Sequence, residues 1–152
     1  MKVGAIYDRY KVKIGGDKIF DPIRNCYVHL TPEEIVRQKT IKFLIQRLKV
    51  PKEKLIVERS LSSLGVLGSR KRIDIGVLDD DGLIMAVIEC KQVFGNGEFA
   101  YAQAQDYLKS LNTRYFFVTD GELFDGFFWN TLQFIKLESI PTYDQWYNYP
   151  KG

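Results

Sequence analysis

The dipeptide Asp81-Gly82, placed between two alternating apolar runs, constrains the fold of this chain more than any other feature of its sequence. Asp-Gly between such runs is a strong short-range signal for a β-hairpin with a two-residue turn. We therefore predict a hairpin from Arg72 to Lys91 in which Asp80 pairs with Leu83. That one pair sets the partner of every other residue in the two strands.

The predicted register gives the hairpin one apolar side, which we expect to be buried under a helix, and one side that ends in charges. The apolar pairs are Ile73 with Cys90, Ile75 with Ile88, and Val77 with Ala86. The pairs on the other side are Leu78 with Met85, Gly76 with Val87, Asp74 with Glu89, and Arg72 with Lys91.

The opposed carboxylates of Asp74 and Glu89 need an explanation, because like charges held directly opposite each other are destabilising. They require a cation between them, a shared proton, or full contact with water. The run 84–88 is apolar on both faces, which is typical of an interior strand and argues against full solvation. The sequence therefore predicts a divalent metal ion at this end of the hairpin, which we expect to be open to solvent.

The length and composition indicate one ordered domain over residues 1–152. With 45% hydrophobic and 14% aromatic residues, the chain is not of the disordered class. A net charge of +3 is only mildly basic, so affinity for DNA must come from local clusters of charge. Two cysteines without a pairing pattern, no signal peptide and no long apolar run predict a soluble cytoplasmic protein without membrane contact.

A helix is predicted to begin at Thr31, because Thr31-Pro32-Glu33-Glu34 has the form of a capping box with proline at the first helical position. The buried stripe of this helix continues backward through Glu34, Arg37 and Gln38. These polar residues then line a cleft, although Glu34 is also explained by the capping box alone. Arg37 and Gln38 are candidate nucleic-acid contacts.

The remaining segments complete the predicted organisation. Residues 1–30 form an extended arm or a short hairpin, and strand 55–60 leads to the basic cluster Arg70-Lys71-Arg72, which either contacts phosphate or is a solvated face. A helix over 98–111 places Gln103 and Tyr107 together at its edge. Strands follow at 115–119, 124–129 and 134–138, and an aromatic tail ends the chain. His29 is the only histidine, which leaves little material for zinc sites or catalytic triads.

The order of these elements, with Asp74 on one strand and Glu89-Cys90-Lys91 ending the next, resembles the PD-(D/E)xK nuclease superfamily. Ile73 stands where that signature has proline. Glu34 lies in the first helix, where many members have a glutamate on the metal side, and the Gln103-to-Tyr107 spacing resembles the QxxxY element of the RecB-like branch. The stretches TPEEIVRQ, KRIDIGV, VIECK, AQAQDY and FFVTDG resemble the N-terminal nuclease domain of type I restriction enzyme R subunits.

The resemblance implies an α/β fold with a restriction-endonuclease-like core, α-β-β-β-α-β, whose central mixed sheet is flanked by helices. The core spans 31–126, with the arm before it and C-terminal strands and the aromatic tail at 127–152. It implies a metal-dependent DNA endonuclease that works alone or with restriction-system subunits. ATP dependence does not carry over, because it belongs to a translocase that follows this domain in the R subunits.

The resemblance also implies roles for individual residues in phosphodiester hydrolysis. Mg²⁺ or Mn²⁺ would be held by Asp74, Glu89, the backbone carbonyl of Cys90 and Glu34, which are the hard oxygen ligands that these ions prefer. Lys91 would orient the attacking water or stabilise the transition state. Gln103 and Tyr107 would contact the phosphate or brace Lys91. Two alternatives remain open: a DNA- or partner-binding module that does not cleave, and a nuclease acting on RNA.

Overall fold

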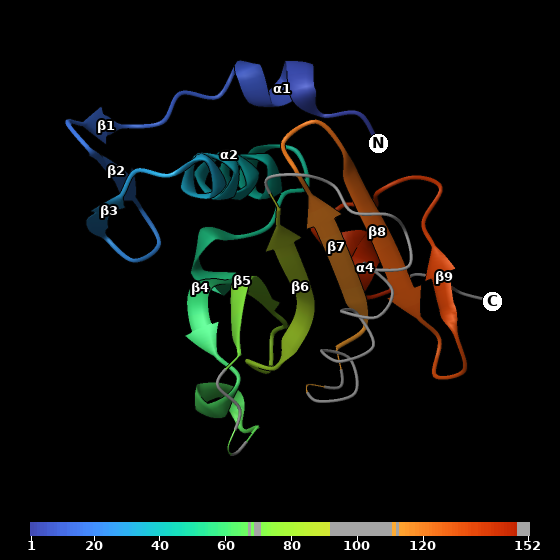
Figure 1. Cartoon of the computed structure of the whole chain (residues 1–152). Coiled ribbons are helices and arrows are strands. Elements are labelled where there is room, and N and C mark those ends of the chain that lie inside the picture. Colours follow the sequence, from blue (N-terminus) through green and yellow to red (C-terminus); the bar gives the residue numbers. More distant parts are fainter. Residues whose placement is uncertain (67, 69–70, 92–110, 112, 149–152) are drawn as a thin grey trace.

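The computed structural model describes residues 1–66, 68, 71–91, 111 and 113–148 (Figure 1). These residues form a mixed α/β fold with a six-stranded mixed sheet, a separate three-stranded sheet and a few helices, which confirms the predicted fold class. The elements in chain order are α1 (Gly4–Asp8), β1 (Ile14–Gly15), β2 (Lys18–Asp21), β3 (Cys26–His29), α2 (Pro32–Gln46), η1 (Lys52–Lys54), β4 (Leu55–Ser60), η2 (Ser62–Leu64), β5 (Arg72–Leu78), β6 (Ile84–Cys90), β7 (Tyr115–Thr119), β8 (Phe124–Trp129), β9 (Phe134–Lys136) and α4 (Tyr143–Trp146).

The large sheet has the strand order β4-β5-β6-β7-β8-β9, and only the β6–β7 pair is parallel. Apolar side chains leave the central strands on both faces, as expected for an interior sheet. Helix α2 lies across one face (Figure 1) and contributes Ile41, Phe43 and Leu44 to the main hydrophobic cluster. The buried ring of Trp146 packs against Tyr115 and Phe117 in this cluster, so this part of the aromatic tail folds back onto its own domain.

Helix α2 begins where the sequence predicts. The Thr31 hydroxyl accepts a hydrogen bond from the backbone N–H of Glu34 at 3.0 Å, and Pro32 occupies the first helical position. The Glu34 carboxylate accepts hydrogen bonds from the side chains of Arg24, Arg37 and Gln38, which belong to the site described below.

The β5–β6 hairpin has the predicted register in its centre but a different turn. The pairs Ile75–Ile88, Gly76–Val87 and Val77–Ala86 are confirmed. The predicted pair of Leu78 with Met85 is wrong, because a bulge at Val77/Leu78 pairs Leu78 with Ile84. The predicted two-residue turn between Asp80 and Leu83 is also wrong. Asp79 closes a longer loop, in which its backbone N–H donates to the Leu83 carbonyl and its carboxylate accepts from the N–H groups of Asp81 and Leu83.

The other end of the hairpin also departs from simple alternation. Ile73 is buried, but it belongs to the second hydrophobic cluster with Val87 and Phe116, whereas Ile75 and Cys90 belong to the main cluster. The prediction that Ile73 shares one apolar side with Ile75 and faces Cys90 is therefore wrong. The change of face falls at Asp74.

The neighbouring strand shows a distortion at the matching position. The β4–β5 ladder contains Val57–Ile75 and Arg59–Ile73, and Glu58 lies between these pairs with a φ of 55°. A residue with a side chain rarely adopts this left-handed conformation within a strand. The break in alternation therefore affects both strands at one level, and it turns Glu58 and Asp74 toward α2, where both meet the same arginine.

The predicted N-terminal arm is a short helix, α1, followed by the antiparallel sheet β1-β2-β3. Tyr7 of α1 is buried, and its hydroxyl shares a 2.8 Å hydrogen bond with Thr40 of α2. The three-stranded sheet lies beside the beginning of α2, at the end of the molecule away from β9 (Figure 1). The hairpin alternative for this segment is thus correct for β2–β3, and α1 was not predicted.

We expect Gly126→Ala to destabilise the sheet. A Cβ atom at Gly126 would lie 2.7 Å from the Phe117 ring and 2.9 Å from Leu137 Cδ1. Overpacking of this kind typically costs about 1–3 kcal/mol. Urea denaturation measures the loss, with Gly15→Ala as the matched control, because the nearest atom to a Cβ there is 3.8 Å away. Equal stability of the two variants would contradict this packing.

Candidate functional site

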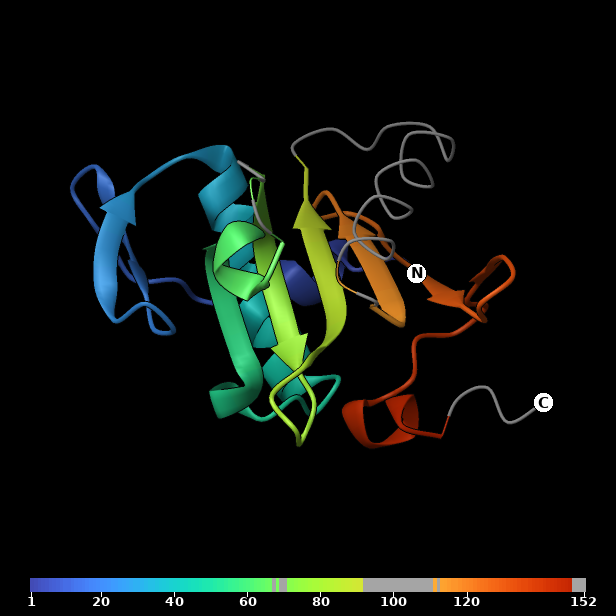
Figure 2. The ribbon, with the colours of Figure 1, turned by 90° about the horizontal axis from the view of Figure 1, so that it is seen from below.

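The elements that carry the acidic residues singled out in the sequence meet at one end of the large sheet. Figure 2 shows the beginning of α2, the beginning of β5 and the end of β6 at this end of the sheet. Glu34 comes from the first turn of α2, Asp74 from β5, and Glu89 with Cys90 from the end of β6. We call the group Glu34, Arg37, Glu58 and Asp74 the acidic site.

Arg37 is the centre of the acidic site. Its guanidinium is 2.6 Å from Glu34 Oε1 and 3.1 Å from Asp74 Oδ1, and it also donates to Glu58 Oε1 at 2.5 Å. Only 6% of Arg37 is exposed. Burial by itself lowers the pKa of Arg37, but the three carboxylates outweigh this effect and raise it. A permanently charged cation therefore holds the three acids together.

Asp74 connects α2, β5 and β6. One oxygen of its carboxylate pairs with Arg37, and the other accepts the backbone N–H of Cys90 at 2.7 Å. The backbone pairing between β5 and β6 begins at Ile75–Ile88. At the position of the predicted Asp74–Glu89 pair, the two strands are joined by the hydrogen bond from the Cys90 N–H to the Asp74 side chain. That pair is not part of the described ladder, and the close approach of the two carboxylates stays a prediction.

The end of β6 is buried more deeply than the sequence predicts. Glu89 is 3% exposed, so the expectation of an open, solvated end holds only for Asp74, whose side chain is 18% exposed. Glu89 aligns with Val118 of the parallel strand β7. Lys91 is half-buried and follows directly after β6, where its backbone N–H donates to the Thr119 carbonyl at 2.8 Å.

The polar residues of the first turns of α2 face inward, as predicted. The Gln38 side-chain amide donates to Glu34 Oε2 at 3.2 Å. Arg37 and Gln38 are 6% and 2% exposed, so neither offers a surface to a nucleic acid in this arrangement, and their predicted nucleic-acid contact stays a prediction. Lys71 and Arg72 are exposed, and Arg72 also donates to the Glu58 carbonyl at 3.0 Å. The candidates Arg70, Gln103 and Tyr107 lie outside the described residues.

Two parts of the network were not predicted. Glu58 is the only acidic residue of strand 55–60, which is a weak signal, and nothing in the sequence indicates its left-handed backbone. Arg24 donates from Nε to Asp21 at 2.7 Å and from Nη2 to Glu34 at 2.9 Å, which ties the N-terminal sheet to the acidic site.

Asp21, which accepts the hydrogen bond from Arg24 Nε, is fully buried. Burial raises the pKa of its carboxyl, but hydrogen bonds from Arg24 and Ile23 outweigh that effect and lower it. Asp21 therefore stays ionised at neutral pH and keeps its bond to Arg24.

The donor chemistry of the acidic site suits a hard divalent cation, because Glu34, Glu58 and Asp74 offer carboxylate oxygens from three elements. However, the guanidinium of Arg37 already lies among these carboxylate oxygens and pairs with all three acids. Among the described residues, no three His, Cys, Asp or Glu side chains lie close enough together to hold a metal ion. A metal ion bound there would compete with Arg37 for the Asp74 carboxylate.

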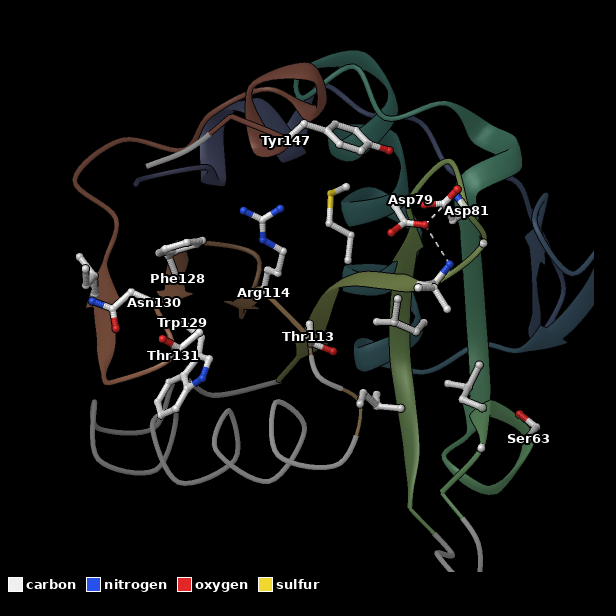
Figure 3. Close-up of a pocket in the computed structure, with 18 residues that line it drawn as sticks. Ser63, Asp79, Asp81, Thr113, Arg114, Phe128, Trp129, Asn130, Thr131 and Tyr147 are labelled. Carbon is white, nitrogen blue, oxygen red and sulfur yellow. Dashed lines mark hydrogen bonds between the residues drawn. The ribbon is translucent and has the colours of Figure 1, made fainter. Parts of the chain in front are cut away.

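A large pocket of about 1430 Å³ lies at the opposite end of the sheet, and no residue of the acidic site lines it. Figure 3 shows Arg114, Tyr147 and Asp79 around it. Its lining also includes Leu111 and Thr113, which adjoin residues outside the described part of the chain, and we assign it no function.

Comparison with known protein families gives a match over most of the chain. The family model described as the type I restriction enzyme R protein N terminus matches residues 32–141, which is more than half of the chain and includes every residue of the acidic site. A search among curated proteins found no match. No helix in the described parts of the chain combines the length and the apolar character that spanning a bilayer demands.

Proposed function

Since this chain belongs to the family of the type I restriction enzyme R protein N terminus, which indicates a restriction-related nuclease domain, we propose that it is a metal-dependent DNA endonuclease. It would act alone or with other subunits of a restriction system. The observation that carries this proposal is the convergence of carboxylates from α2, β4 and β5 at the end of the sheet where β6 ends in Glu89-Cys90 and Lys91 follows. Nucleases that hydrolyse phosphodiesters with Mg²⁺ need such a set of oxygen ligands beside a cationic side chain.

We propose the following roles, which the sequence resemblance implies. Asp74, Glu89, the backbone carbonyl of Cys90 and Glu34 would hold Mg²⁺ or Mn²⁺, which supplies Lewis acidity toward the phosphate and a binding place for the attacking water. Lys91 follows Glu89 by two residues and would place its ammonium group against the charge that develops on the phosphate. Gln103 and Tyr107 are proposed, from the sequence resemblance, to contact the phosphate or brace Lys91.

Arg37 gives this proposal a specific requirement. One carboxylate oxygen of Asp74 already accepts from Arg37 and the other from Cys90, so both are engaged. We therefore propose that a metal ion bound by Asp74 competes with Arg37 for this carboxylate. In the metal-free protein Arg37 would act as the substitute cation that keeps Glu34, Glu58 and Asp74 in place.

The same observation favours one alternative, a module that binds DNA or a partner subunit without cleaving. A carboxylate cluster whose three acids are already paired with an internal arginine is held together without a metal ion, as a structural network would be. The two functions differ in metal binding and in cleavage, so one set of measurements separates them.

We also propose a cytoplasmic location, because neither cysteine forms a disulfide.

The proposed function is tested by nicking of supercoiled plasmid with Mg²⁺ or Mn²⁺, against a reaction containing EDTA. We expect metal-dependent nicking by the wild type. Lys91→Ala should reduce it at least about 100-fold through loss of electrostatic stabilisation. Titration calorimetry should show that the variant still binds Mn²⁺, because Lys91 is not a ligand.

Lys136→Ala is the matched control, since this lysine is exposed on β9 and its loss should leave nicking unchanged. A wild type that neither binds Mn²⁺ at millimolar concentration nor nicks DNA would rule out the nuclease. Metal binding without nicking would point to a missing subunit. The same reactions with a labelled RNA substrate distinguish a ribonuclease.

A further inference from the structure

The net positive charge of this chain comes from its N-terminal arm, residues 1–30. Residues 1–30 contain six basic residues and three acidic ones, so they carry a net charge of +3, the same as the whole chain. Residues 31–152 contain 16 of each and are neutral. The acids of the arm are Asp8, Asp17 and Asp21, and Asp21 is buried and paired with Arg24. A charge asymmetry of this kind indicates a polyanionic partner for the arm.

The three-stranded sheet places part of this charge on one face. Opposed residues in an antiparallel sheet share a face, and the pairs here include Lys18 with His29 and Phe20 with Tyr27. The backbone N–H of Phe20 donates to the Lys13 carbonyl at 2.8 Å, which aligns Lys13 with the same pair. The alternate residues Ile19 and Asp21 are fully buried, so they mark the inner face.

The outer face therefore combines lysines with aromatic rings. The rings of Phe20 and Tyr27 are 5.3 Å apart, and Lys13 Nζ lies 5.5 Å and 5.8 Å from their centroids. Tyr27 is 46% exposed, and Lys11, Lys13 and Lys18 are exposed as well. Lysines that reach phosphates, beside aromatic rings on which a base can stack, are the combination found on surfaces that bind single strands of nucleic acid.

The N-terminal sheet is also close to the acidic site. Figures 1 and 2 both place β1, β2 and β3 beside the beginning of α2, the helix that carries Glu34. Arg24, in the β2–β3 turn, bonds both Asp21 of β2 and Glu34 of α2 through partly buried ion pairs, which fix the sheet to the site. DNA held on this sheet would therefore be held near the acidic site.

We propose that the outer face of the N-terminal sheet is the DNA-docking surface of this protein. Its lysines contact the phosphate backbone, and Tyr27 with Phe20 stacks on an unpaired base. The proposal rests on the proposed function, because it specifies how that site receives its substrate. It assigns the main DNA contact to the arm and not to the cluster at Lys71 and Arg72. The surface comprises Lys11, Lys13, Lys18, Phe20, Tyr27 and His29.

The test is fluorescence anisotropy with labelled 20-nucleotide single-stranded and 20-base-pair duplex DNA, in EDTA so that no cleavage occurs. The variant Lys11→Glu/Lys13→Glu/Lys18→Glu should bind both at least about 30-fold more weakly than the wild type. The slope of log affinity against log salt should fall by about 2–3, because each lost lysine removes about one phosphate contact. Tyr27→Leu should weaken only single-stranded binding, by about tenfold.

The matched control is Arg47→Glu/Lys49→Glu/Lys52→Glu, which makes the same charge change at exposed positions near the other end of α2. It should bind DNA within about threefold of the wild type, since its residues make no phosphate contact. Circular dichroism and thermal melting confirm that each variant is folded.

Equal weakening by both triple variants would mean that net charge alone drives binding and would overturn the proposal. A wild type that binds no DNA would also overturn it and would favour an acidic protein partner on this face. If the arm variants bind DNA normally while the wild type nicks plasmid, the docking surface is wrong and the nuclease stands.

Discussion

Asp74→Ala is expected to abolish metal-dependent nicking, with a loss of at least about 1000-fold if Asp74 is the ligand proposed here. The substitution removes the one carboxylate that joins Arg37 of α2 to Cys90 of β6, through contacts of 3.1 and 2.7 Å. It should also abolish the rise in melting temperature that Mn²⁺ produces in the wild type, because a ligand stabilises a protein only through the folded state that binds it. Plasmid nicking and thermal melting with and without Mn²⁺ measure both effects.

The stability of the metal-free protein separates this effect from simple unfolding. Asp74→Ala leaves the Cys90 N–H without its acceptor, and an unsatisfied buried group of this kind costs about 1–3 kcal/mol. Asp74→Asn keeps an oxygen for that hydrogen bond, but it loses the charge and places its amide NH2 group against Arg37. We expect it to be more stable than Asp74→Ala and equally inactive. Nicking by Asp74→Asn at the wild-type rate would remove Asp74 from the site.

Arg37→Gln is expected to have the largest effect on stability. It leaves Glu34, Glu58 and Asp74 close together without the cation that now holds them. Breaking a buried ion pair costs about 3–5 kcal/mol, and we expect the lower part of that range because Glu58 and Asp74 are partly exposed. Urea denaturation in EDTA measures the loss.

The response of Arg37→Gln to metal distinguishes a substitute cation from an ordinary structural arginine. If the guanidinium and a divalent ion compete for the same carboxylates, the variant should bind Mn²⁺ at least about tenfold more tightly than the wild type and regain part of its stability. Arg59→Gln is the matched control, because Arg59 is exposed on the same strand as Glu58. Unchanged or weaker Mn²⁺ affinity in Arg37→Gln would contradict the competition.

The parts of the fold that follow from local pattern were predictable. The capping hydroxyl of Thr31, the inward-facing Glu34 and the central register at Ile75–Ile88 all come from spacing along one or two elements. The prediction of the two-residue turn was wrong because the Asp79 side chain accepts hydrogen bonds that close a longer loop, in place of the turn that Asp81-Gly82 favours.

Glu34 and Asp74 of the acidic site were predicted as site residues, but their arrangement was not. Both contact Arg37, which was predicted to line a cleft and to contact nucleic acid, not to pair with the acids. A prediction from periodicity assigns each strand residue to one face of the sheet and assumes a regular backbone. Such a prediction could not reveal the left-handed backbone of Glu58 or the place of Ile73 in the second hydrophobic cluster, because both result from packing between distant elements.

The left-handed backbone at Glu58 also makes aggregation through the edge strand β4 less favourable. Strand β4 is the outermost strand of the large sheet on one side, and an exposed edge is a template onto which another chain can add a strand and begin to aggregate. A residue with φ of 55° in mid-strand interrupts the regular row of edge N–H and carbonyl groups that such addition needs. The distortion that turns a carboxylate toward Arg37 therefore makes β4 a poor template for self-association.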